Sequence, residues 1–462
     1  MPDQQDNTIV NGSGPDIPTA TPTQPDVPAT PAAATEPEAA PALPLLEPAD
    51  GVPPVVETPE GVAAAVAALR AGTGPLAVDA ERASGFRYSN RAYLVQLRRA
   101  GSGTILLDPI PTADHLDELA EVINDLEWVL HAADQDLACL EELGLRPRAL
   151  FDTELGGRLA GYERVGLAAM IGNLLGFHLA KGHGADDWST RPLPDDWLTY
   201  AALDVELLLE LREKVAADLE KQGKLDWALE EFEHVRTSPP SGPRPDRWRR
   251  TSGLQTLKST RQLAAVRELW IERDDIAAQR DISPGRVLPD AAIINAAKTA
   301  PRSRTALIAL PIFSGSRQRR RADRWFAALQ RARDLPDSEL PPRSAPFDGP
   351  PPANRWARKD PEAAARLTAA RTALREVADQ QRLPLENLLT PDLVRRLCWT
   401  WPSDLIATEE HPADLDRVRE YVGGVLSAGG SRRWQRDLAI EPLAAALSTA
   451  TAAAETAPDS AE

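Results

Sequence analysis

The chain has 462 residues, with 69 acidic and 52 basic side chains and a formal net charge of −17. As an average, that charge argues against a nucleic-acid-binding protein, because a polyanion binds a basic surface. The charge is unevenly distributed, however: residues 1–60 carry −10, residues 451–462 carry −3, residues 61–240 carry −13, residues 241–340 carry +9 and residues 341–450 are about neutral. The average therefore conceals one basic segment.

Cysteine content and apolar runs indicate the compartment. Only Cys139 and Cys398 are present, so no disulfide framework is expected and a reducing compartment is favoured. The first ten residues lack the basic and apolar regions of a secretory signal, and no run of about 18 apolar residues occurs. We therefore expect a cytoplasmic protein that does not enter a membrane.

The N-terminal half begins with a tail and continues into a mixed sheet. Residues 1–55 are rich in Pro, Ala, Thr and acids, so a disordered tail is predicted there, followed by a folded domain over 56–236. The apolar patterns of that domain predict helices at 60–71, 113–126 and 133–143 and strands at 75–79, 93–97, 104–108 and 128–131. Three successive strands followed by alternating helix and strand predict an α/β fold with a mixed sheet.

Proline-rich segments divide the second half of the chain. Residues 237–250 and 336–354 are predicted linkers, since proline interrupts helices and stiffens connections. The segments between and after them, 251–335 and 355–447, have helical patterns, and residues 448–462 are predicted to be a second disordered tail.

Two carboxylates stand at the end of the first predicted strand. Asp79 and Glu81 are two residues apart, and alternate residues of a strand point to the same side. Two carboxylates on one side of a strand form half of an oxygen-ligand site for Mg²⁺ or Mn²⁺. The alternative is that this short pattern is an ordinary polar surface.

A third acid follows the strand at 128–131, where the chain turns into a helix. Either Asp134 or Asp136 could be presented at the edge of the sheet there, and spacing alone does not separate them. The alternative role for either one is a helix cap, which would stabilise the helix by about 0.5–2 kcal/mol.

Tyr200 and Asp204 are one helical turn apart and share a face of an Ala- and Leu-rich helix. Burying an acid there is costly unless it is paired or binds a metal, although a plain polar stripe is the alternative. Four acids would suit two divalent ions about 3.5–4 Å apart, which drive in-line attack on a phosphodiester. Tyr200 would orient the attacking water, because a phenol can donate and accept a hydrogen bond.

Several segments at characteristic spacing resemble ribonuclease D, a 3′→5′ exonuclease of the tyrosine subtype of the DEDD superfamily. They are VDAE at 78–81, YLVQL at 93–97, LHAADQDL at 130–137, and DWSTRPL at 187–193 before YAALDV at 200–205. The resemblance implies a ribonuclease H-like mixed-sheet domain with Asp79, Glu81, Asp136 and Asp204 as metal ligands and Tyr200 as the water-orienting residue. Two departures stand out: Ala80 replaces a usual Thr, and Arg82 follows the Glu where an aromatic residue is common.

The helical segments carry a second resemblance. RQLAAVRELW at 261–270 and RVLPD at 286–290 resemble the HRDC domain, a small helical bundle, and residues 355–447 resemble a more divergent copy. No Walker-type phosphate loop is present, so a helicase is not indicated. The basic residues Arg317, Arg319 and Arg320 are candidates for contact with RNA phosphates, with a solvated helix face as the alternative.

Three more residues are candidates for contact with the RNA 3′ end. Lys181, Trp188 and Arg191 lie in a loop-like stretch before the Tyr200 helix, and packing within that loop is the alternative for each. The resemblance thus implies a metal-dependent exoribonuclease that trims RNA 3′ ends, tRNA precursors among them, with two Mg²⁺ or Mn²⁺ ions. A DNA 3′→5′ exonuclease of Werner-helicase or proofreading type is one alternative, and a non-catalytic nucleic-acid-binding module is another.

Overall fold

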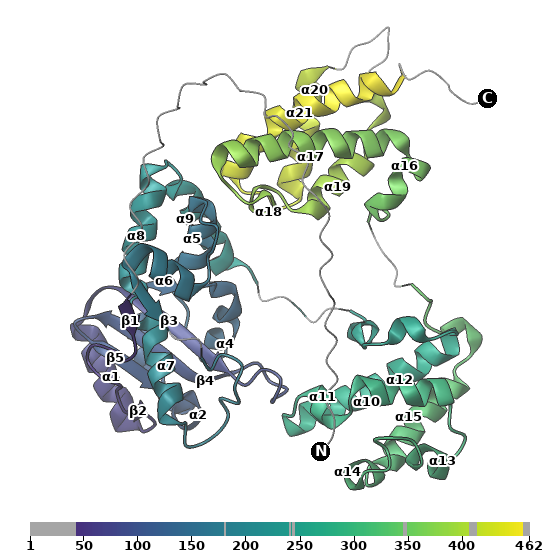
Figure 1. Cartoon of the computed structure of the whole chain (residues 1–462), viewed down its shortest axis with the longest axis horizontal. Helices are drawn as coiled ribbons and strands as arrows, with labels where there is room; N and C mark the ends of the chain where they lie inside the picture. The colour runs from purple at the N-terminus through teal and green to yellow at the C-terminus, as the bar shows by residue number, and fades with distance from the viewer. Residues whose placement is uncertain are drawn as a thin grey trace, which may run out of the picture. The chain divides into compact units, whose positions relative to one another are not determined.

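The computed structural model describes residues 43–179, 182–239, 242, 245–344, 349–405 and 414–455. An α/β region comes first in the chain and is followed by helical regions (Figure 1). The predicted order of a mixed α/β domain before helical segments is therefore confirmed. None of the helices in the described ranges combines the length and apolarity needed to cross a membrane.

The α/β region contains the strands and the first helices. Its strands are β1 (Leu43–Leu45), β2 (Val55–Val56), β3 (Thr73–Arg82), β4 (Ala92–Ala100), β5 (Gly103–Leu107), β6 (Glu127–Leu130), β7 (Ala149–Asp152) and β8 (Phe177–Leu179). Its helices are α1 (Pro59–Ala71), α2 (Pro109–Thr112), α3 (Asp117–Ile123), α4 (Leu137–Glu141), α5 (Thr153–Ala160), α6 (Leu167–Leu175), α7 (Asp195–Glu206), α8 (Leu208–Lys221) and α9 (Leu225–Thr237).

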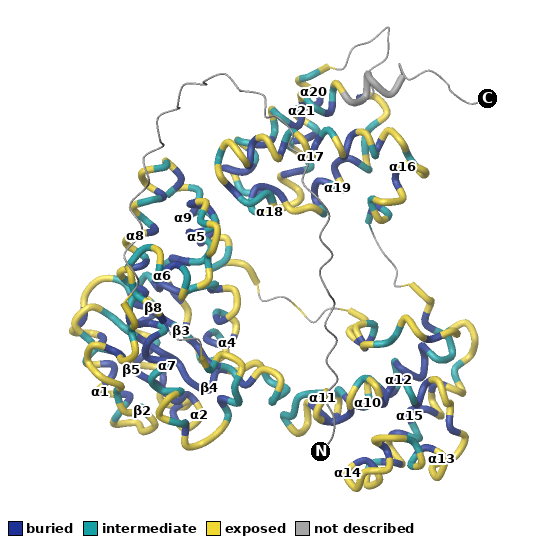
Figure 2. The backbone as a smooth tube through the Cα atoms, in the orientation of Figure 1, coloured by how far each residue is buried: buried dark blue, intermediate teal, exposed yellow. Residues whose placement is uncertain are grey.

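Six strands form one mixed sheet in the order β2-β5-β4-β3-β6-β7. β3, β4 and β5 pair antiparallel, whereas β6 runs parallel to β3 and β7 parallel to β6. Leu76, Ala77 and Val78 of β3 are at most 1% exposed, because helices cover both faces of the sheet. Figure 2 shows this burial as dark blue in the middle of the sheet. Asp79 and Glu81 lie in the last four residues of β3.

The predicted disordered tail is wrong for its last residues. β1 pairs parallel with β8, with the Leu43 amide donating to the Gly176 carbonyl at 2.8 Å, and β2 pairs with β5. Averaging composition over 55 residues hides these short apolar runs, whose backbone groups can join an existing strand. Residues 1–42 lie outside the described part of the chain.

The predicted C-terminal disorder over 448–462 is also wrong in part. The last helix continues to Glu455, because its alanine-rich end has high helix propensity. Residues 456–462 are outside the described ranges, as are parts of the two predicted linkers, namely 240–241, 243–244 and 345–348.

Two groups of helices follow. The first comprises α10 (Thr260–Arg280), α11 (Pro284–Val287), α12 (Asp290–Thr299), α13 (Arg304–Ile308), α14 (Ser316–Arg319) and α15 (Ala322–Asp334). The second comprises α16 (Trp356–Lys359), α17 (Pro361–Gln381), α18 (Leu385–Leu388), α19 (Pro391–Trp399), α20 (Leu415–Ala428) and α21 (Arg433–Glu455). The first group has its own apolar core, which includes Leu269, Phe313 and Trp325.

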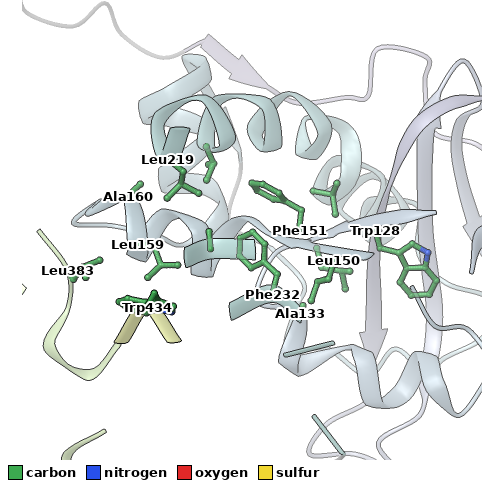
Figure 3. Packing of buried hydrophobic residues seen from close by; sticks show 14 of the residues in the cluster. Trp128, Ala133, Leu150, Phe151, Leu159, Ala160, Leu219, Phe232, Leu383 and Trp434 are labelled. Atoms are coloured by element: carbon green, nitrogen blue, oxygen red, sulfur yellow. The ribbon is translucent and has the colours of Figure 1, made fainter. Parts of the chain in front are cut away.

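A large hydrophobic cluster includes buried residues of the sheet and of the last helices. Phe151 of β7 and Phe232 of α9 pack with ring centroids 4.8 Å apart, and Figure 3 shows them beside Leu159 and Trp434. Trp434 of α21 stacks on Trp227 of α9 at 5.4 Å. Residues of the last helices thus share an apolar core with the α/β domain.

Candidate active site

The end of β3 presents two carboxylates on one side. Asp79 pairs in register with Gln96 of β4, and Glu81 pairs with Leu94, so the two acids are alternate residues of one regular ladder. The ladder is regular from Leu76 to Glu81 and becomes irregular again between Glu81 and Arg82. One oxygen each of Asp79, Glu81 and Asp204 lie within 4.8 Å of one another. The strand and a distant helix therefore bring three of the four predicted ligands together.

Helix α7 supplies Asp204 and Tyr200. The helix begins after Pro194, with Asp195 and Asp196 in its first turn, where carboxylates favour the positive end of the helix dipole. Tyr200 and Asp204 are four residues apart, and a hydrogen bond from the Tyr200 side chain lowers the pKa of Asp204, although burial and Asp79 raise it more. The tyrosine and the acid thus act as one unit on the face of α7 that meets β3.

Asp136 stands at the start of α4 but does not cap it. Its side chain makes no hydrogen bond to the first turn of the helix, and the residue is 5% exposed. Asp134 is exposed, and only Asp136 of the two lines the cavity that contains Asp79. The Asp136 carboxylate instead forms an ion pair with Arg82, with Oδ1 3.2 Å from Nη2. Geometry thus separates two acids that spacing left equivalent.

The turn that carries Asp136 is held by Asp152, a residue for which the sequence pattern indicated no function. The Asp152 carboxylate accepts hydrogen bonds from the amides of Ala132 and Ala133, and from two amides in the first turn of α5. Ala132 has a φ of 62°, a left-handed conformation that costs about 1–2 kcal/mol in a non-glycine residue. The sequence does contain a signal for this role of Asp152. An aspartate between an apolar strand and a helix is a typical N-cap pattern.

A cavity of about 400 Å³ joins these groups. Its walls include the four acids Asp79, Glu81, Asp136 and Asp204, together with Tyr200, His131 and Arg82. A space of this size lies at the lower end of the range for small-molecule sites and suits the end of a polymer. All four acids therefore face one opening, even though only three have oxygens in immediate proximity.

Burial makes the charged forms of these acids costly. It raises the pKa of Asp79 to about 6, that of Asp136 to about 8 and that of Glu81 to about 10, with neighbouring carboxylates adding to the rise for the last two. Burial and then Asp79 raise the pKa of Asp204 as well. A cluster of four carboxyl groups that faces a single arginine, Arg82, suits hard divalent cations such as Mg²⁺ or Mn²⁺. The donor set therefore fits the predicted metal ions.

Two neutral groups complete the cavity wall. Burial lowers the pKa of His131 to about 4, and its Nδ1 lies 2.9 Å from the Thr153 hydroxyl. Burial and the charge of Asp204 raise the pKa of Tyr200, so its hydroxyl remains protonated at neutral pH. His131 is thus a neutral lining residue, and Tyr200 is a hydrogen-bonding one.

The loop before α7 packs closely on Tyr200. A Cβ atom at Gly182 would lie 2.5 Å from Tyr200 Cδ2, so only glycine fits this approach. The His183 ring meets Tyr200 edge-on at 5.8 Å, and its Nδ1 is 2.7 Å from an Asp186 oxygen. No local pattern in the sequence predicts this contact, because glycine is common in loops of any kind.

Arg191, a candidate for RNA contact, is fully used inside the protein. Its Nε and Nη2 donate to the two oxygens of Asp108 at 2.6 and 2.9 Å. The remaining donors bind the carbonyl oxygens of Trp188, Thr190 and Tyr93. All five N–H groups of the guanidinium therefore have partners, and the side chain anchors the loop to the start of α2.

The other candidate RNA-contacting residues lie in different surroundings. Trp188 is 0% exposed and donates its indole N–H to the His183 carbonyl, so it packs the loop from within. Lys181 is outside the described residues. Arg317, Arg319 and Arg320 are exposed around α14, and in the described ranges none of them forms an ion pair with a carboxylate.

Family models match three parts of the chain. A model described as a 3′-5′ exonuclease matches residues 53–220, and the HRDC model matches residues 262–329. A third model, described as the 3′ to 5′ exonuclease C-terminal domain, matches residues 349–447. The segment predicted as a second HRDC copy thus matches a model of its own, and its likeness to HRDC stays a prediction.

Relatives and solved structures extend these matches. Ribonuclease D of Gluconacetobacter diazotrophicus is 32% identical over 291 residues, covering 60% of this chain and 72% of that protein. A crystal structure of a protein from Bifidobacterium adolescentis has a TM-score of 0.78 and 36% identity, covering 88% of this chain and 99% of that one. Escherichia coli RNase D, described as an exoribonuclease involved in structured RNA processing, has a TM-score of 0.58 and 25% identity, covering 81% and 98%.

These matches extend beyond the catalytic domain into the helical regions, as the motif resemblance implied. That resemblance is confirmed, and the chain belongs to the ribonuclease D family of 3′→5′ exoribonucleases.

Proposed function

We propose that the chain holds two divalent ions, Mg²⁺ or Mn²⁺, and hydrolyses RNA from its 3′ end to release nucleoside 5′-monophosphates. The observation that carries this proposal is the cluster of Asp79, Glu81 and Asp204, with oxygens within 4.8 Å at the wall of one cavity. Carboxylates this close cannot all ionise unless positive charge lies between them.

The residues of the site have separate roles in this scheme. Asp79, Glu81, Asp136 and Asp204 hold the ions, which when bound supply a nucleophile from water at neutral pH and stabilise charge on the leaving 3′ oxygen. Tyr200 orients the attacking water, because its protonated hydroxyl can donate and accept hydrogen bonds. Asp204 lies one helical turn from Tyr200 on α7, and in this scheme its carboxylate accepts from that hydroxyl and directs it.

Structured RNA, including tRNA precursors, is the substrate class that we propose. The description of the Escherichia coli relative as an exoribonuclease involved in structured RNA processing supports it. The net charge of +9 over residues 241–340 supports it as well, since a site rich in carboxylates needs help to retain a polyanion.

An arginine cluster in the first helical group is our candidate for that help. Burial lowers the pKa of Arg321, and four neighbouring arginines lower it further: Arg280, Arg317, Arg324 and Arg320. One buried nitrogen of Arg321 has no hydrogen-bond partner among the described residues. Arg324 is already paired with Glu272 and Asp275, whereas the other four arginines form no ion pair within the described ranges. We propose that RNA phosphates bind these four, because converging guanidinium groups repel one another unless an anion neutralises them.

A digest of end-labelled RNA tests the catalytic proposal. With a 5′ label and Mg²⁺ or Mn²⁺, a ladder of products that shorten one nucleotide at a time is expected, whereas EDTA should stop the reaction. Asp79→Asn should remove activity while RNA binding remains. Unchanged RNA with both metals would overturn the proposal.

Matched variants and substrates sharpen that test. Asp136→Asn should lower the rate by roughly 10²-fold or more, while Asp134→Asn, which changes an exposed acid two residues away, should leave it nearly unchanged. A single-stranded DNA of the same sequence, added as competitor, separates a ribonuclease from a general exonuclease. A structured RNA with an overhanging 3′ end, compared with an unstructured one, tests the substrate class.

A further inference from the structure

Arg82 is the one arginine or lysine that lines the catalytic cavity in the described part of the chain, and the other basic side chain there, His131, is neutral. It follows Glu81 directly, at the point where the pairing of β3 with β4 becomes irregular. Its Nη2 lies 3.2 Å from Asp136 Oδ1, and its Nη1 donates to the Gln135 carbonyl at 2.6 Å. A cation therefore already occupies the side of the cavity where Asp136 would meet a metal ion.

The arrangement of the acids reflects this pair. Asp79, Glu81 and Asp204 have oxygens within 4.8 Å, whereas Asp136, which faces the same cavity, is not part of that cluster. The charge of Arg82 also favours the ionised forms of Asp79, Glu81 and Asp136. A divalent ion that binds Asp136 must therefore compete with the Arg82 guanidinium. Without substrate, that ion has to displace the guanidinium by itself.

The guanidinium is free to exchange partners. Beyond its contacts with Asp136 and Gln135, Arg82 makes no other hydrogen bond or ion pair within the described ranges, and its side chain is 21% exposed. Guanidinium groups bind phosphate oxygens through paired N–H donors. The phosphate at an RNA 3′ end enters the same cavity, so it offers Arg82 an alternative anion at short range.

We propose that Arg82 is a resident counter-ion of Asp136 and a positioning residue, displaced jointly by a divalent ion and by the phosphate of the substrate. Metal binding at Asp136 and binding of the RNA end are then coupled, and the coupling is reciprocal. This inference rests on the proposed function, because it assumes divalent ions at the carboxylates.

Titration of the full-length chain with Mn²⁺, followed by electron paramagnetic resonance, tests the coupling without measuring turnover. Two Mn²⁺ ions about 3.5–4 Å apart couple their spins and lose the six-line signal of isolated ions. The wild-type chain should bind one ion first and form the coupled pair only at high Mn²⁺. Adding AMP, as the probe for the product phosphate, should tighten the second site by about 5- to 150-fold.

Variants at position 82 distinguish the guanidinium from general charge. Arg82→Met and Arg82→Gln should form the Mn²⁺ pair without AMP, at concentrations about tenfold lower than wild type. Arg82→Lys should restore the weak second site in part. Arg87→Met removes a positive charge from the same hairpin, where Arg87 binds the Ser189 hydroxyl rather than an acid, and it should behave as wild type.

Each outcome decides the matter. If Arg82→Met and Arg82→Gln, folded by circular dichroism, titrate as wild type does, the inference fails while the proposed function stands. If Arg87→Met tightens the second site equally, general charge explains the effect and the inference also fails. If no variant binds Mn²⁺ at the carboxylates, the proposed function fails and the inference with it.

Discussion

Two arginine–aspartate pairs in the exonuclease domain differ in how fully the guanidinium is used. All five N–H groups of Arg191 donate hydrogen bonds, to Asp108 and to three carbonyl oxygens. Arg82 uses two of its guanidinium nitrogens, one in the ion pair with Asp136 and one as donor to the Gln135 carbonyl. The first pair fixes a loop, and the second leaves donors for a ligand. Saturation of the donors, rather than position in a motif, separates a structural arginine from an exchangeable one.

The loss of Arg191 should have the largest effect on stability. Arg191→Met leaves the Asp108 carboxylate buried without its counter-charge, which should lower the free energy of unfolding by about 3 kcal/mol or more. Urea unfolding followed by tryptophan fluorescence measures it. The double variant Arg191→Met/Asp108→Leu should recover part of the loss, because no uncompensated charge remains. A loss below about 1 kcal/mol would show that the pair does not anchor the loop.

The same loop should affect catalysis through its shape. Gly182→Ala forces the Tyr200 ring to move, so kcat should fall by roughly 10- to 100-fold. Gly184→Ala is the matched control, because its Cβ would lie 3.5 Å from the Tyr200 hydroxyl, an ordinary contact. Rates on 5′-labelled RNA measure both variants, and equal rates would contradict a positioning role for Gly182.

The acid cluster should make stability depend on pH when divalent ions are removed. Folding raises the pKa of Asp79 to about 6, of Asp136 to about 8 and of Glu81 to about 10, so the folded chain binds more protons than the unfolded one. Stability from these acids is fully present below about pH 4 and is lost as pH rises through those values. In EDTA, the thermal midpoint should fall by about 2–6 °C between pH 6 and pH 9.

Asp136→Asn provides the control for that dependence. The difference between wild type and this variant cancels other groups, such as Lys224, whose pKa burial lowers to about 8. The variant should show a weaker fall with pH, and excess Mg²⁺ should remove most of the fall in the wild type. A wild-type midpoint that rises with pH more steeply than that of the variant would contradict the prediction.

Arg82 should matter least for stability. Arg82→Met also leaves a buried carboxylate without its partner, but burial already raises the pKa of Asp136 to about 8, so a proton can replace the lost charge and the free energy of unfolding should fall by only about 1–2 kcal/mol. Its KM for RNA should nevertheless rise by roughly 3- to 10-fold, because a phosphate partner is lost. Steady-state kinetics at saturating Mg²⁺ measure the change. A stability loss as large as that of Arg191→Met would remove the distinction between the two pairs.

Local patterns predicted much of this molecule. The mixed sheet followed by helical regions is confirmed, because alternating apolar residues and proline-rich breaks are visible over short windows. Asp79 and Glu81 share a side of β3, and Tyr200 and Asp204 share a face of α7, as the periods of strand and helix require. What the sequence could suggest was which residues face together within one element.

Contacts between residues of elements that are distant in the sequence could not be predicted from such local patterns. Arg191 meets Asp108, 83 residues earlier in the chain, whereas its place in a loop before the Tyr200 helix left both an RNA contact and packing open. In the sequence, Arg82 stood out only because it replaces the aromatic residue common in the family. Its pairing with Asp136 depends on how β3 and β6 are placed in the sheet. Strand β1 was missed because its three residues gain order only by pairing with β8.

The contacts of Asp152 affect the order in which the active site can assemble during synthesis of the chain. Its carboxylate joins the turn at Ala132 to the start of α5, so the segment that carries Asp136 is fastened only after β7 has been synthesised. Asp204 follows some fifty residues later. A growing polypeptide, surrounded by ribosomal RNA, therefore has no complete set of the proposed metal ligands until α7 has emerged. Synthesis of most of the domain precedes any ability to cut RNA.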